Sequence, residues 1–228
     1  MIVVVGPASL RLAPTGVGRA EGTAPAIAAA AAADGAVVEI VTKIGDDGAG
    51  EELLLALARA GVGHLAVLRD PAGPTSLALD DDEPPDEDLE LVPALLAEAE
   101  AARRPTAGSR SVVRSAPILE PADLGLALGY LRDYGVLVAV EPFTEGGAAV
   151  IAEAASFVDA GLVVIAPSGL PVPAAYAAAT IIEAPGDDPE GAFAVLVGRY
   201  AAALDRGIAP AEAFHAVTAE GGWSVAAD

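Results

Sequence analysis

The sequence predicts an α/β fold with three layers, in which helices cover both faces of a mostly parallel sheet. Composition is one reason: 54% of the 228 residues are hydrophobic but only 4% are aromatic, so small aliphatic side chains must build the core. The other reason is order, because short β-branched runs alternate with longer runs rich in Ala and Leu. We expect one domain over residues 1–228, with ligands at the carboxyl ends of the parallel strands.

The first half of the chain opens with a buried strand. Residues 2–5 are a β-branched run that Gly6 and Pro7 stop, and we expect this strand near the centre of the sheet. A helix over residues 22–36 follows, with Thr23 as its expected N-cap. The next elements are a strand over 37–45, a helix over 50–61, and strands over 64–70 and 74–80, the last two expected to be neighbours.

The second half repeats the alternation of strands and helices. We expect helices over 91–104, 121–135, 146–161, 190–207 and 209–222, and strands over 111–119, 136–143, 162–169 and 174–186. The run DDDEPPDED at residues 80–88 is too charged to be buried, so we expect a solvated loop there. This order is typical of parallel strands joined through crossover helices.

Charge and composition exclude several classes of function. The formal net charge of −21 repels phosphate backbones and anionic lipid heads, so we expect no nucleic acid and no membrane as partner. The chain has no cysteine, which excludes disulfides, thiolate metal sites and thiolate nucleophiles. No apolar run reaches the length of a membrane span and the first residues lack a basic segment, so we expect a soluble, cytoplasmic protein.

A glycine- and aspartate-rich turn, KIGDDGAG, precedes the second expected helix. Asp46 and Asp47 would repel a phosphate, and no further carboxylate stands at a spacing that suits a metal ion. We therefore interpret this stretch as a tight turn in which Gly45 and Gly48 adopt unusual backbone dihedrals.

Residues 37–79 carry a resemblance to a known family. The run VVEIVTKIGDDGAGEELLLALARAGVG, followed by LRDPAGPTSLAL, resembles the ribokinase-like carbohydrate kinases of the PfkB family. The resemblance implies a ribokinase-like α/β/α sandwich and ATP-dependent phosphoryl transfer to a hydroxyl group of a sugar or nucleoside, with ATP and Mg²⁺ as cofactors. In that family the G-D-D turn is an architectural corner near the substrate, which implies a substrate-side position for Gly45 and Asp46.

The resemblance extends to the N-terminal segment GRAEGTAPAIAAAAAADGA. It is similar to the family segment in which a pair of glycines precedes an alanine-rich helix, and this implies substrate-binding positions at Gly18 and Gly22. The connection between Val5 and Gly18 is shorter than the one that holds the lid strands of the family. We therefore expect a lid that is reduced or absent.

The sequence near the C-terminus contains the segment to which the resemblance assigns catalysis. IIEAPGDDPEGAFAVLVGRYAAALDRG resembles the family's D-T-x-G-A-G-D-x-F segment and the helix after it. In the family, backbone N–H groups at this helix start form an anion hole for ATP, and the Asp takes the proton of the attacking hydroxyl. If Phe193 is matched to the family Phe, the catalytic position becomes Gly191. If Gly186 is matched instead, Asp188 is the base, with Gly186, Asp187 and Gly191 at the anion hole.

These residues leave two functions open beside a third, a dinucleotide-dependent enzyme, which rests only on the glycines of GVGRAEG at residues 16–22. One is an active ATP-dependent kinase of a small sugar or nucleoside, with Asp188 as the base. The other is a degenerate homologue, a pseudokinase, that binds a ligand or a partner protein without catalysis. The chain contains no Asn and therefore cannot supply the family's N-x-x-E magnesium motif. Loss of lid strands would also leave a cleft or an edge to cover, for which a homodimer is one solution.

Overall fold

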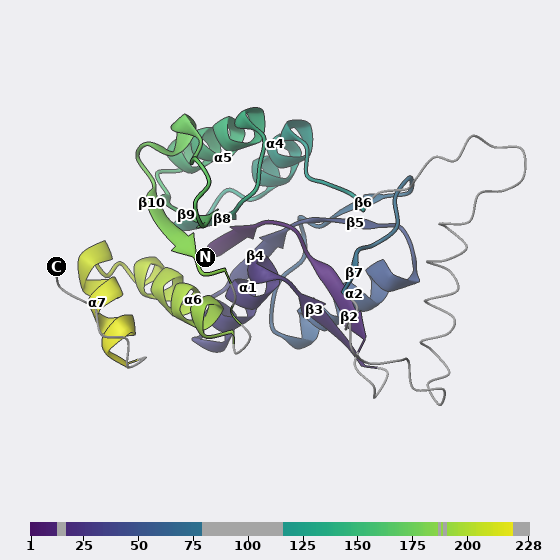
Figure 1. Cartoon of the computed structure of the whole chain (residues 1–228), viewed down its shortest axis with the longest axis horizontal. Helices are drawn as coiled ribbons and strands as arrows, with labels where there is room; N and C mark the ends of the chain where they lie inside the picture. The colour runs from purple at the N-terminus through teal and green to yellow at the C-terminus, as the bar shows by residue number, and fades with distance from the viewer. Residues whose placement is uncertain (13–16, 79–115, 187, 189–190, 221–228) are drawn as a thin grey trace, which may run out of the picture.

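The computed structural model describes residues 1–12, 17–78, 116–186, 188 and 191–220. Its centre is a five-stranded sheet with the strand order β10-β9-β8-β1-β4, in which every neighbouring pair is parallel (Figure 1). The strands are β1 (Ile2–Val5), β4 (Val38–Val41), β8 (Val136–Val140), β9 (Gly161–Pro167) and β10 (Thr180–Ala184). The first strand is fully buried between β8 and β4, as the sequence predicts.

Helices cover both faces of this sheet. α1 (Thr23–Ala33), α6 (Ala192–Asp205) and α7 (Pro210–Glu220) lie on one side, and α4 (Pro121–Tyr130) and α5 (Glu145–Phe157) lie on the other (Figure 1). α1 is followed closely by Gly35, whose φ of 86° suits glycine at the end of a helix. The three-layer α/β/α fold expected from the sequence is confirmed.

Alternation of side chains along the strands divides the core into two clusters. Val4 and Val138 pack on the side of α1 and α6, whereas Val3 and Leu137 pack on the side of α4 and α5. Because both faces of the sheet are covered, β1 and β8 are continuous apolar runs in the sequence.

α1 and α6 pack closely because both present small side chains. A Cβ on Gly198 of α6 would lie 2.6 Å from the Cβ of Ala30 and 2.8 Å from the carbonyl oxygen of Ile27. A larger residue at Gly198 would therefore have to move a helix backbone. The close contact holds the two helices side by side, with their first turns at the same edge of the sheet.

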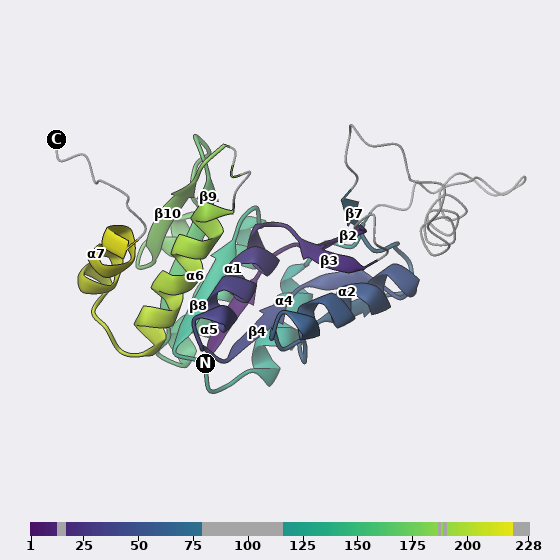
Figure 2. The same ribbon diagram turned by 90° about the horizontal axis from the view of Figure 1, so that it is seen from below.

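Two smaller sheets extend the molecule beyond β4 (Figures 1 and 2). β2 (Ser9–Leu12) pairs antiparallel with β3 (Gly18–Glu21) and parallel with β7 (Leu77–Ala78), and α2 (Gly48–Arg59) packs against β2 and β3. β5 (Lys43–Gly45) pairs with β6 (Leu68–Asp70). The short connection after β1 thus contains the strand β2. The small sheet of β3, β2 and β7 lies where the sequence predicted a lid that is reduced or absent.

Several expected strands differ from the observed ones. The strand expected over residues 37–45 is split into β4 and β5, because β5 leaves the central sheet to pair with β6. The strands expected over 64–70 and 74–80 are shorter, and the prediction that they are neighbours is wrong, since β7 pairs with β2. The first part of the strand expected over 174–186 is a 3₁₀ turn, η1 (Ala174–Tyr176). An apolar run alone does not reveal where a chain changes sheet.

Several expected elements lie outside the described residues. They are the helix over 91–104, the acidic run at 80–88 and the first part of the strand over 111–119. The described end of that last segment, residues 116–119, is not a strand. In the part of the chain that the structure describes, no helix combines the length and the apolar character needed to cross a bilayer.

Candidate functional site

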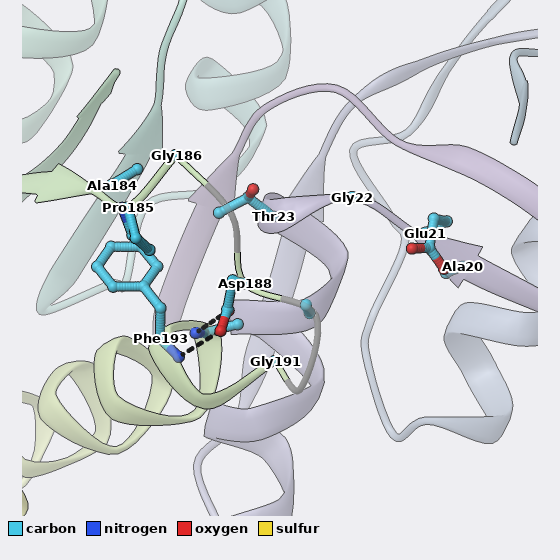
Figure 3. Close-up of a pocket in the computed structure, with 12 residues that line it drawn as sticks. Ala20, Glu21, Gly22, Thr23, Ala184, Pro185, Gly186, Asp188, Gly191 and Phe193 are labelled. Carbon is cyan, nitrogen blue, oxygen red and sulfur yellow. Dashed lines mark hydrogen bonds between the residues drawn. The ribbon is translucent and has the colours of Figure 1, made fainter. Parts of the chain in front are cut away.

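A pocket of about 500 Å³ opens where the first turn of α1 meets the first turn of α6 (Figure 3). Its walls come from the end of β3, the start of α1, the end of β10 and the start of α6. Its polar side chains are those of Glu21, Thr23 and Asp188, and Pro185 and Phe193 contribute apolar surface. The pocket thus lies at the carboxyl end of β10, where parallel α/β sheets commonly bind ligands.

Gly22 shapes the wall that belongs to α1. It precedes the helix with a φ of 117°, which side chains of L-residues rarely permit, and its carbonyl accepts a hydrogen bond from the Ala26 N–H at 3.1 Å. The prediction that Thr23 is the N-cap is wrong, because Thr23 is already the first helical residue and the helix start has no side-chain cap. The exposed Thr23 lines the pocket instead.

Asp188 shapes the wall that belongs to α6. Its carboxylate accepts hydrogen bonds from the backbone N–H groups of Phe193 at 3.1 Å and of Ala194 at 3.3 Å (Figure 3). Gly191, with a φ of 67°, closes the turn, and its N–H donates to the Asp188 carbonyl at 3.0 Å. Asp188 therefore occupies free amides at the start of α6, the kind of group that binds anions at helix N-termini.

The pocket is rich in hydrogen-bond acceptors. Glu21 and Asp188 lie on different walls, and no lysine, arginine or histidine is among the described residues that line the pocket (Figure 3). The Glu21 carboxylate pairs with Nε of Arg11 at 3.1 Å, from β3 to β2. Because ionised carboxylates only accept hydrogen bonds, this lining favours ligands that supply hydroxyl or amine donors and disfavours phosphates.

Four of the site residues predicted from the sequence meet in this pocket: Gly22, Gly186, Asp188 and Gly191. The sequence left two alignments open, one that puts Gly191 at the catalytic position and one that puts Asp188 there. Both residues line this pocket, so both alignments lead to the same site. Asp187, predicted beside the cofactor, lies outside the described residues.

The other three predicted site residues lie elsewhere. The N–H of the buried Gly18 donates to Oε1 of Glu52 in α2 at 3.3 Å. Asp46 is exposed and pairs with Arg69 at 3.1 Å. Neither these two residues nor Gly45 line the pocket, and their substrate-side position stays a prediction.

The G-D-D turn is a hydrogen-bonded corner. The Asp47 carboxylate caps the start of α2 at 2.8 Å and accepts hydrogen bonds from the Thr75 N–H at 2.9 Å and the Thr75 hydroxyl at 2.6 Å. The Gly45 N–H donates to the same hydroxyl oxygen at 2.9 Å. The unusual dihedrals predicted for Gly45 and Gly48 are wrong, because neither has a positive φ. Gly45 is needed for close approach instead, since a Cβ there would lie 2.6 Å from the carbonyl oxygen of Gly73.

Sequence reasoning did not assign Glu21, Thr23 or Pro185 to a ligand site. Glu21 directly precedes Gly22 in the segment considered for substrate binding, so the sequence could have indicated that Glu21 lies at the same site. Phe193 entered only as an anchor for alignment. Nothing in the local sequence indicates that these residues face one another across a pocket.

Solved structures share this architecture. A PfkB protein from Polaromonas sp. JS666 matches with a TM-score of 0.59 and 16% identity, over 96% of this chain and 93% of that chain. A ribokinase from Arabidopsis thaliana, complexed with ribose and ATP, matches with a TM-score of 0.59 and 15% identity, over 96% of this chain and 90% of that chain. The chain has a ribokinase-like fold.

The ribokinase-like fold expected from the resemblance is thereby confirmed. Because the sequence identities are only 15–16%, the similarity to these structures concerns the fold and not the function. No family model matches the sequence, and no curated protein matches it either. The residues of this chain must therefore be tested directly against the ligands that the fold suggests.

ATP and Mg²⁺ fit the described residues poorly. No group of three or more His, Asp or Glu side chains that could hold a metal ion occurs in the described part of the chain. A triphosphate would meet the carboxylates of Glu21 and Asp188 without a basic side chain among the described lining residues. The amides of Phe193 and Ala194, which a phosphate would need, already donate to Asp188.

Proposed function

We propose that this protein is a catalytically degenerate relative of the ribokinase-like sugar kinases, a pseudokinase that binds a small hydroxyl-rich molecule without phosphoryl transfer. One observation carries the proposal: the Asp188 carboxylate accepts hydrogen bonds from the backbone N–H groups of Phe193 and Ala194. The group that the resemblance assigns as the catalytic base thus fills the helix start that would receive a phosphate.

The acceptor-rich lining indicates the class of ligand. A sugar or nucleoside carries several hydroxyl donors, which the carboxylates of Glu21 and Asp188 are suited to accept. The apolar surface of Pro185 and Phe193 suits the carbon face of a sugar ring or a base. The ligand we expect is therefore a neutral or cationic polyol, and not a sugar phosphate.

The second candidate function is an active ATP-dependent kinase of the same class of ligand. It is favoured by one observation, the position of Asp188 beside Gly186 and Gly191 on the wall of the pocket. In this function the Asp188 carboxylate would have to leave the α6 amides before it could accept a proton from a substrate hydroxyl. Bound ATP and Mg²⁺ would supply the phosphoryl group and its charge compensation.

A thermal-shift titration separates the two candidates. Wild-type protein is melted with a panel of free sugars and nucleosides, each with and without Mg²⁺ and ATP, and the mixtures are assayed for phosphorylated product. A ligand at about 100 times its Kd stabilises a protein by about 2.7 kcal/mol, which raises the melting temperature by several degrees. The proposal expects a shift with at least one free sugar or nucleoside and none with Mg²⁺ and ATP.

Asp188→Asn and Asp133→Asn serve as a matched pair in this titration, since Asp133 is exposed and does not line the pocket. A shift caused by Mg²⁺ and ATP, together with a phosphorylated product that Asp188→Asn no longer makes, would overturn the proposal in favour of the kinase. Absence of a shift with every sugar and nucleoside would remove the proposed ligand class.

A further inference from the structure

The outer side of α4 is apolar and exposed. Gly125, Leu126, Gly129 and Tyr130 are all exposed, and their spacing puts them on one side of the helix. Leu126 is 55% exposed and Tyr130 is 78% exposed. No atom lies within 4 Å of the Cβ that either glycine would gain, so the helix backbone is open between the two larger side chains.

α5 extends this apolar surface, because α4 and α5 lie side by side and point in the same direction. At their starts, a Cβ on Gly146 would lie 3.3 Å from Cγ of Pro121. At their ends, the Tyr134 hydroxyl donates to the Ala154 carbonyl at 3.2 Å. Phe157, the last residue of α5, is 87% exposed. We call the exposed sides of these two helices the α4–α5 face; it lies on the opposite side of the central sheet from α1, α6 and the pocket (Figure 1).

Acidic residues surround the α4–α5 face. Over residues 120–159 the chain has seven acidic side chains and one basic side chain, Arg132. Asp133 follows α4 and Glu153 belongs to α5, and both are exposed. α4 itself contains one ionisable side chain, Asp123, whose carboxylate already pairs with a lysine at 2.9 Å. The face is thus apolar along α4 and acidic around it, as is common where an apolar interface core has a polar rim.

We propose that the α4–α5 face binds an amphipathic helix of a partner protein, with leucine-like residues on its apolar side and lysine or arginine residues on its flanks. A row of apolar side chains on such a helix fits over the open backbone of Gly125 and Gly129, between Leu126 and Tyr130. The basic flanks then face the surrounding carboxylates. This proposal does not depend on the ligand that the pocket binds.

Charge favours a basic helix over other occupants of the face. A second copy would bring the same acidic residues, and two chains with a formal net charge of −21 repel each other. An anionic lipid surface is repelled for the same reason. A basic helix instead attracts the carboxylates that lie within a Debye length of it, about 8 Å at physiological ionic strength. Complementary charge also speeds its encounter with the face.

Peptide binding tests the proposal. The probe is a fluorescent peptide of leucine and lysine, about 18 residues or five helical turns long, with its leucines on one side of the helix. A second peptide has the same composition in scrambled order, and a third carries glutamate in place of lysine. Fluorescence anisotropy with the full chain at physiological ionic strength measures the dissociation constants. We expect the first peptide to bind about tenfold more tightly than the other two, and equal binding of all three would overturn the proposal.

Leu126→Lys and Leu55→Lys form a matched pair of variants. Both replace a half-exposed leucine in a helix and add one positive charge, but Leu55 belongs to α2. We expect Leu126→Lys to weaken binding of the first peptide about tenfold and Leu55→Lys to leave it unchanged. Tyr130→Lys is a second change on the same face and should act like Leu126→Lys. Circular dichroism checks that each variant is folded. Equal affinities of the α2 and α4 variants would place the binding elsewhere and overturn the proposal.

Two other occupants are outcomes of the same experiments. If a second copy covers the face, light scattering will give the wild-type chain twice its mass of 22.5 kDa and will give Leu126→Lys as a monomer. If another part of this chain covers the face, the ordered leucine and lysine peptide will bind no more tightly than the scrambled one. Either result would overturn the proposed partner helix.

Discussion

The Asp188 carboxylate accepts a hydrogen bond from the backbone N–H of Phe193 at 3.1 Å, five residues further along the chain. A single side chain therefore stabilises the start of α6 and also contributes negative charge to the pocket beside it. This double position explains why the candidate base is not free to act as one in the described structure. A substitution of Asp188 therefore changes the stability of α6 and the charge of the pocket at the same time.

Replacement of Asp188 should destabilise α6. Asp188→Ala removes the acceptor for two backbone N–H groups, and we expect a loss of about 0.5–2 kcal/mol in the free energy of unfolding. Asp188→Asn keeps one carbonyl acceptor and should lose less. Urea unfolding followed by circular dichroism measures both effects, with the exposed Asp133→Ala as control. Equal stability of Asp188→Ala and wild type would mean that the carboxylate does not cap the helix.

The Asp47 and Thr75 pair should behave as one unit. Two hydrogen bonds join the Asp47 carboxylate to Thr75, at 2.9 and 2.6 Å. Asp47→Ala and Thr75→Val should each cost about 1–3 kcal/mol, because each leaves polar groups without partners. The double variant should cost clearly less than the two single losses together, since both break the same contacts. Strict additivity in a urea-unfolding cycle would show that the corner is not held by this pair.

Gly198 should tolerate no side chain. Gly198→Val would push into the backbone of α1, and we expect a loss of about 1–3 kcal/mol or more. Gly129 of α4 is the matched comparison, because no atom lies within 4 Å of the Cβ that alanine would add. Gly129→Ala should stabilise the protein by about 0.5–1 kcal/mol through its higher helix propensity. Melting temperatures that fall equally for both variants would contradict this account of the α1 and α6 contact.

The Asp123 carboxylate should make the free energy of unfolding depend on pH in the acidic range. Burial acts to raise the pKa of Asp123, but hydrogen bonds from the Glu120 N–H at 3.0 Å and the Lys43 ammonium at 2.9 Å outweigh it and lower the pKa below 3.8. Its contribution is therefore present above the unfolded-state pKa and is lost as the pH falls through the lowered folded-state pKa. Lys43, whose pKa the same hydrogen bond raises, stays charged throughout this range.

Asp123→Asn tests this dependence. We expect the variant to lose about 1–3 kcal/mol of unfolding free energy near neutral pH, and the difference from wild type to shrink as the pH falls below about 4. Asp133→Asn, an exposed carboxylate without these partners, should show no such change. A difference between Asp123→Asn and wild type that is independent of pH would contradict the ionic origin of the contribution.

The elements that sequence reasoning located best are those with a strong local signal. β8 and α6 lie within their expected ranges, because a continuous apolar strand and a long alanine-rich helix are recognisable without tertiary information. β5, β6 and β7 have two or three residues each and owe their existence to pairing partners in other parts of the chain. Their sheets could not be predicted from the composition of the runs that contain them.

The candidate site was predictable in part for the same reason. Asp188 and Gly191 were found through a motif that is local in sequence. Glu21 joins them only because β3 ends beside the start of α6, and this contact follows from the packing of α1 on α6. The hydrogen bonds of Asp188 to the α6 amides depend on the path of the turn before the helix, which no residue pattern specified.

The two walls of the pocket come from opposite ends of the sequence, with Gly22 on one and Asp188 on the other. A nascent chain on the ribosome therefore possesses the first wall long before the second has been synthesised. Binding in the pocket is possible only after α6 has packed against α1. A ligand of this pocket would bind only the folded protein and would therefore shift the folding equilibrium toward it. The fraction of unfolded chains would fall, and the abundance of the protein in the cell would rise.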